Sequence, residues 1–81
     1  MLLDVIEARY IHGFTVWIKF EDGTEGDVDL SGELYGPVFE PLKVVNYFKL
    51  VKVDPELGTI VWPNGADLAP EFLYDKVHVH A

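Results

Sequence analysis

Carboxylates are the most numerous chemically active side chains in this sequence, and one run of them follows a tryptophan. The chain has 81 residues, with 14 Asp and Glu against six Lys and Arg, a formal net charge of −8. No basic residue lies between Lys19 and Lys43, an interval that holds Glu21, Asp22, Glu25, Asp27, Asp29 and Glu33. Such a surface either keeps a small protein soluble or meets a basic partner, since complementary charge raises association rate and specificity.

Motifs for catalysis and cofactor binding are missing from the sequence. The chain has no cysteine, which excludes thiol nucleophiles, thiolate metal sites and disulfides. It has no Gly-x-Ser-x-Gly, no P-loop and no dinucleotide fingerprint, and Ser31 is its only serine. Paired carboxylates could act as general acid and base, but nothing singles out one pair. We therefore expect no cofactor, and the sequence favours a non-enzyme without deciding the matter.

Two patterns resemble metal sites without completing one. Asp27-x-Asp29-x-Ser31-Gly32 matches the first half of a calcium loop, but Val38 stands where a bidentate Glu is required. His78 and His80, near Asp75, could bind a metal with a third ligand or could be ordinary residues of a terminus. We predict no metal site.

Apolar alternation and turn residues predict three strands in the first half, over 3–11, 14–20 and 25–30, joined by turns at His12-Gly13 and 21–24. Because Val5 and Ile6 are adjacent, alternation in the first strand is imperfect, and either one face or a bulge must absorb the break. In the second strand, Phe14, Val16, Ile18 and Phe20 face inward; in the third, Val28 and Leu30 do so while Asp27 and Asp29 face out.

Trp17 has the opposite phase to the inward residues, which predicts a place on the wetter face with Thr15 and Lys19. An exposed Trp resembles an interaction anchor, because Trp is enriched at binding hot spots. The alternative is that a helix or the tail covers it. The predicted partner-binding residues are Trp17, Asp22, Glu25, Asp27 and Asp29.

The second half mixes short helices and strands. Pro37 and Pro41 forbid one continuous helix, so helical turns are expected around 37–42 and 44–48. These turns should pack on the sheet through Leu34, Val38, Phe39, Leu42, Tyr47 and Phe48. Strands are predicted over 49–53 and 59–62, then a helix from Asp67 as N-cap, with Pro70 in its first turn, to about residue 75, and a tail over 76–81.

These elements predict a single α+β domain over residues 1–81. Its five-stranded, mainly antiparallel sheet would follow the order β-β-β-short α-β-β-α, with short helices on one face. A second candidate site, for a small ligand or a reaction, lies around the last turn and helix, at Trp62, Asn64, Asp67 and Tyr74. A helix N-terminus there could bind an anion, but Asp67 as N-cap would occupy its donors.

The whole pattern resembles a small prokaryotic family of domains of unknown function, the family numbered 2442. The resemblance covers nearly the whole chain and rests on Asp29-Leu30, Gly36, Phe39, Leu42, Phe48, Val51, Gly58-Thr59-Ile60, Trp62-Pro63-Asn64-Gly65, Asp67-Leu68, Pro70 and Leu73-Tyr74. It implies a small α+β domain with no assigned activity. It also implies relatives that are often encoded beside another very small protein, as toxin–antitoxin pairs are, and some that add a helix-turn-helix segment. No such segment follows here, so we expect no DNA-binding role from it.

Taken together, these features favour a small acidic, non-enzymatic interaction domain, and the family resemblance suggests for it the role of the neutralising, antitoxin-like member of a two-protein pair. The alternatives are the ligand or enzyme role near Trp62 and a transcription accessory that acts through a DNA-binding partner. Direct nucleic-acid binding is disfavoured because the basic residues (Arg9, Lys19, Lys43, Lys49, Lys52 and Lys76) are scattered. With no signal peptide or apolar span, a cytoplasmic location is expected. An exposed edge strand could form a homodimer seam.

Overall fold

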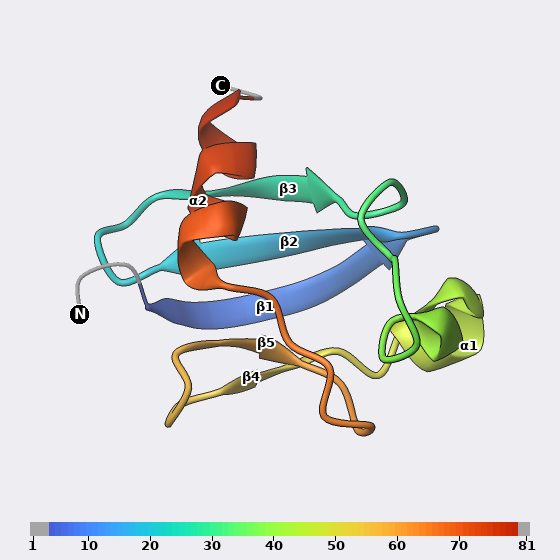
Figure 1. Ribbon diagram of the computed structural model, residues 1–81. Helices are drawn as coiled ribbons and strands as arrows, with labels where there is room; N and C mark the ends of the chain where they lie inside the picture. Colours follow the sequence, from blue (N-terminus) through green and yellow to red (C-terminus); the bar gives the residue numbers. More distant parts are fainter. Residues whose placement is uncertain (1–3, 80–81) are drawn as a thin grey trace.

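A computed structural model describes the backbone of residues 4–79 and the side chains of residues 4–77. Its first half is an antiparallel meander of β1 (Val5–His12), β2 (Thr15–Phe20) and β3 (Glu25–Asp29), in the order β1-β2-β3 (Figure 1). The three predicted strands are confirmed. Val16 and Ile18 of β2 and Val28 of β3 are fully buried, as strict alternation requires.

The first strand contains a bulge and a second irregularity. Val5 lies opposite Phe20 but Glu7 lies opposite Lys19, so Ile6 is the extra residue, 53% exposed. A second shift falls between Tyr10 and His12. A bulge bends its strand and increases the local twist. The two bulges therefore set the register in which the residues of β1 pair with those of β2.

The second half forms a separate sheet, so the prediction of one five-stranded sheet is wrong. Among the described residues, strands β4 (Lys52–Asp54) and β5 (Thr59–Val61) form a two-stranded sheet of their own, and Val61 makes one further bridge, to Asp67. One backbone hydrogen bond, from the Val5 N–H to the Gly58 carbonyl at 2.9 Å, joins this hairpin to β1. The bulge at Ile6 follows at once, and it turns β1 away before a ladder can continue.

The fourth strand begins later than predicted because the preceding helical turn continues. A 3-10 helix, η1 (Glu40–Lys43), is followed by the single turn α1 (Val45–Phe48). The N–H groups of Leu50 and Val51 donate to the carbonyls of Tyr47 and Phe48, which keeps residues 49–51 out of the sheet. Val38, predicted to pack on the sheet, is 51% exposed instead.

The last helix, α2 (Pro70–Val79), crosses one face of the meander (Figure 1). It is longer than predicted, and the tail expected over 76–79 is helical. Leu73 and Val77, one helical turn apart, are both buried. Val77 lies directly over the backbone of Gly26, where a Cβ atom would stand 3.2 Å from Cγ1 of Val77. This packing on the sheet stabilises the final turns, which local sequence alone does not predict.

The core lies between the meander, α2 and the β4–β5 hairpin. It is built from buried residues of all these elements and of η1, α1 and the loops: Val5, Val16, Ile18, Phe20, Val28, Leu30, Leu34, Leu42, Phe48, Ile60, Trp62, Ala66, Leu73 and Val77. This arrangement leaves the opposite face of the meander, the one that carries Trp17, outside the core.

Candidate functional site

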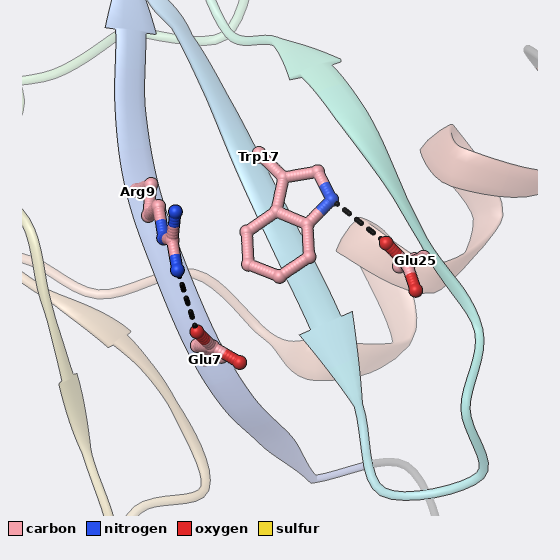
Figure 2. Close-up of polar contacts among 4 residues, drawn as sticks. All are labelled: Glu7, Arg9, Trp17 and Glu25. Atoms are coloured by element: carbon pink, nitrogen blue, oxygen red, sulfur yellow. Dashed lines mark hydrogen bonds and ion pairs between the residues drawn. The ribbon is translucent and has the colours of Figure 1, made fainter.

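The candidate site is the face of the meander that points away from α2. We call it the outer face and define it by Glu7, Arg9, Ile11, Thr15, Trp17, Lys19, Glu25, Asp27 and Asp29. Trp17 stands at its centre, because its strand partners are Arg9 on β1 and Asp27 on β3. Figure 2 shows Trp17 standing on the strands with α2 behind them. The predicted wetter location of Trp17 is confirmed, and α2 does not cover it.

Neighbouring side chains hold the Trp17 ring in place and leave it half-buried. The indole Nε1 donates a hydrogen bond to Oε1 of Glu25 at 3.2 Å (Figure 2). On the other side, the Arg9 guanidinium carbon lies 5.6 Å from the ring centroid, within cation–π range. Arg9 is itself paired with Glu7 at 3.3 Å. A shallow hollow of about 320 Å³ is lined by Arg9, Ile11 and Trp17.

The outer face is acidic at one edge rather than throughout. It carries four carboxylates, Glu7, Glu25, Asp27 and Asp29, and two cations, Arg9 and Lys19, a net charge of −2. Three of those carboxylates lie on β3, which contains no cation of its own, although Lys19 of β2 lies opposite Glu25 and the charge of Lys76 acts on Asp29. On the outer face, β1 and β2 therefore have mixed charge, and the negative charge gathers along β3.

Asp29 belongs to this edge and also shapes the chain that follows it. Its Oδ1 accepts a hydrogen bond from the Ser31 backbone N–H at 2.9 Å. That bond, followed by the Ser31 hydroxyl, lowers the pKa of the Asp29 carboxyl, because both favour its ionised form. Asp29 is therefore a firmly negative group at the end of β3.

Asp22, also predicted as a partner-binding residue, is engaged elsewhere. Its Oδ1 accepts the Thr24 backbone N–H at 2.9 Å, and its Oδ2 accepts the Tyr74 hydroxyl at 2.7 Å. These bonds close the β2–β3 turn and attach α2 to it. The structure thus joins one residue from each predicted site, Asp22 and Tyr74, in a contact that holds the fold.

The other members of the alternative site are also used by the fold. Trp62 is 2% exposed, and its indole N–H donates to the Phe48 carbonyl at 2.9 Å. The Asn64 side chain donates to the Val38 carbonyl at 2.8 Å and accepts the Ala66 N–H at 3.1 Å. The prediction that Asp67 caps the helix is wrong, because α2 begins at Pro70 and Asp67 bridges to Val61 as a short strand pair.

Sequence reasoning missed Arg9 and Ile11 as neighbours of Trp17. Counting outward from a two-residue turn at His12-Gly13 places Arg9 opposite Val16, on the wrong face. The shift between Tyr10 and His12 moves Arg9 to the position opposite Trp17. No residue in this segment marks that bulge, so the sequence offered no signal for the pairing.

Metal ligands do not gather anywhere in the part of the chain whose side chains are described. Within residues 4–77 no group of three or more His, Cys, Asp or Glu side chains could hold an ion. The predicted alternative at His78 and His80 lies outside the side chains that the structure describes.

No helix among residues 4–79 has the length and apolar character needed to cross a membrane.

Comparison with known proteins identifies a family and nothing more specific. A family model described as a protein of unknown function (DUF2442) matches residues 5–79, from the start of β1 to the end of α2. Neither the curated proteins nor the solved structures contain a match. The family resemblance noted from the sequence is confirmed.

Proposed function

We propose that this chain, which belongs to the DUF2442 family of proteins of unknown function, is a non-enzymatic interaction domain that binds a small basic protein through its outer face. The observation that carries this proposal is the placing of Trp17. Its half-buried ring stands at the centre of the sheet face that points away from α2, oriented by Glu25 and Arg9, beside the three carboxylates of β3.

Such a face suits a basic partner for two physical reasons. A large, oriented aromatic ring supplies apolar contact area at little entropic cost, and Trp residues dominate many binding hot spots. Exposed carboxylates beside it attract Lys and Arg during encounter and reject acidic competitors. Ile11, 42% exposed, extends the apolar contact along β1.

We further propose that the partner is the other member of a two-protein pair, which this chain neutralises. This part of the proposal draws on the gene arrangement that the family resemblance implies and on the net charge of −8. An acidic domain without catalytic motifs can neutralise a basic partner simply by covering its working surface.

Capture from the native host tests the proposal. Tagged wild-type chain, Trp17→Ala and Tyr35→Ala are compared at physiological salt, and bound proteins are identified by mass spectrometry. Tyr35 is the matched control, an aromatic side chain that is 73% exposed and lies outside the sheet. We expect one small basic protein to be recovered with wild type and Tyr35→Ala and lost with Trp17→Ala.

Two results would contradict the proposal. One is capture of the same partner by Trp17→Ala as by wild type. The other is a purified complex whose affinity does not fall as salt is raised, since exposed charge pairs are screened within about 10 Å at 0.1 M salt.

A further inference from the structure

The backbone of β3 has one side unpaired, and the ladder shows which residues face that side. The Leu30 N–H donates to the Phe14 carbonyl at 2.9 Å, and the Phe20 N–H donates to the Thr24 carbonyl at 2.8 Å. Because bonding direction alternates along an antiparallel strand, Gly26 and Val28 also bond to β2. Glu25, Asp27 and Asp29 therefore direct their N–H and C=O groups away from it. We call these backbone groups the β3 edge.

In the described chain, β3 has no strand neighbour besides β2. Helix α2 passes over its inner face near Gly26, where Val77 sits, and Asp27 and Asp29 lie further along the strand (Figure 1). An unpaired row of N–H and C=O groups is a template for another strand. The open edge and the acidic row belong to the same residues, since the side chains of Glu25, Asp27 and Asp29 stand on the outer face.

Charge decides which strand can use this template. Two copies of the chain that paired antiparallel about Asp27 would place Asp27 opposite Asp27 and Glu25 opposite Asp29. Like charges directly opposite each other destabilise a strand pair. The β3 edge is therefore a poor seam for a homodimer. A strand with Lys or Arg at alternate positions would meet a carboxylate at each of them.

We propose that the β3 edge binds an extended segment of a basic partner as a fourth strand of the meander. The segment has Lys or Arg at every second position, facing the outer face beside Trp17. Its intervening residues are apolar and face the α2 side, where Val28 and Val77 lie. Main-chain bonds supply affinity in such strand addition, and alternate side chains supply specificity. This inference rests on the proposed function and specifies how the partner is held.

Hydrogen exchange in the full chain tests it directly. The probe is a peptide of alternating Lys and Val, about eight residues long to match an ordinary strand. A control peptide has the same composition arranged in two blocks. We expect the alternating peptide to slow exchange at the amides of Glu25, Asp27 and Asp29. The amides of Gly26 and Val28 already bond to β2 and serve as internal controls.

A pair of variants separates the backbone bond from the charge. Asp27→Ala and Asp27→Pro both remove the carboxylate, but only the proline removes the outward N–H and blocks an incoming strand. Proline is tolerated on an edge strand where the N–H faces out. We expect Asp27→Pro to bind the alternating peptide about tenfold more weakly than Asp27→Ala, the effect of roughly 1.4 kcal/mol. Retained protection at Gly26 and Val28 verifies that each variant is folded.

The outcomes distinguish this inference from the proposed function. Peptide binding that depends on Trp17 but leaves the three amides exchanging at the free rate would overturn strand addition and leave the proposed function standing. Equal affinity of folded Asp27→Pro and Asp27→Ala would do the same. No binding of either peptide at low salt would overturn both. If Asp27→Pro does not fold, the exchange experiment on the wild-type chain decides.

Discussion

The two tryptophans of this chain make similar hydrogen bonds in opposite surroundings. The indole N–H of Trp62 donates to the carbonyl of Phe48 inside the core, and its ring lies 5.6 Å from that of Phe48. The indole N–H of Trp17 donates to a carboxylate of Glu25 on an open sheet face, beside a guanidinium. One tryptophan completes the core. The other lies half-buried on the outer face.

This contrast separates a structural region from a candidate binding region. In residues 54–74, polar side chains make hydrogen bonds to the backbone that stabilise the fold. Asp54 and Asn64 accept backbone N–H groups, and the Thr59 hydroxyl donates to the Leu68 carbonyl. The family resemblance is densest in this region. The outer face contains few of the residues on which the resemblance rests, so it has to be judged from its own geometry.

Replacing each tryptophan by alanine should give the largest difference between the two regions. Trp62→Ala empties a fully packed position and should lower the free energy of unfolding by about 3–5 kcal/mol. Trp17→Ala should cost less than about 1 kcal/mol, as for most surface positions. Urea denaturation of both variants measures this. A cost at Trp17 close to that at Trp62 would show that the outer face belongs to the core.

Alanine at two glycines tests how tightly the structural region is packed. Gly58 and Gly13 both have positive φ, +67° and +50°. A Cβ atom at Gly58 would lie 2.5 Å from Oδ1 of Asp4, whereas Gly13 has open space. We expect Gly58→Ala to destabilise by about 2 kcal/mol and Gly13→Ala by about 1 kcal/mol, measured by thermal unfolding. Adding Asp4→Ala should remove most of the difference, and persistence of the full difference would contradict the contact.

Substitutions at Asp22 and Asp27 should affect different properties, the first stability and the second partner binding, although both side chains are exposed. Asp22→Ala removes bonds to Thr24 and Tyr74 and should cost about 1 kcal/mol of stability without weakening partner binding. Asp27→Ala should weaken binding and leave stability unchanged. Tyr74→Phe, which keeps the ring against Phe20 at 5.0 Å, should add little to Asp22→Ala in a double mutant. Full additivity would show that the two side chains act independently.

The smallest expected effect is a pH dependence at Asp29. Its folded pKa is lowered, so the stability it contributes is complete above the ordinary Asp pKa and disappears as pH falls through the lowered value. At neutral pH, the free energy of unfolding of Asp29→Ala should be about 0.5 kcal/mol lower than that of Asp27→Ala, because only Asp29→Ala loses the exposed hydrogen bond to the Ser31 N–H. The two should converge at strongly acidic pH. A difference that stays constant with pH would contradict the assigned cause.

Local patterns in the sequence were sufficient to predict the meander and its two faces. Alternation at Phe14–Phe20 and at Val28–Leu30 depends only on the two-residue period of a strand, and the second turn depends on the Asp22-Gly23 pair. The first turn falls at Gly13-Phe14, one residue later than predicted, because His12 still belongs to β1. The outward position of Trp17, Asp27 and Asp29 follows from the same period. Both kinds of signal depend only on residues that are close together in the sequence.

Only the tertiary structure decided the rest, because it depends on contacts between distant residues. A bulge of β1 brings Arg9 to Trp17, and the packing of Val77 over Gly26 supports the last turns of α2, which extends to Val79. The two-residue period of the strand places Trp17 on the outer face, but no local signal places Trp62 in the core. The contacts of Trp62 come from another segment of the chain, which supplies Phe48, and those contacts make this tryptophan part of the core.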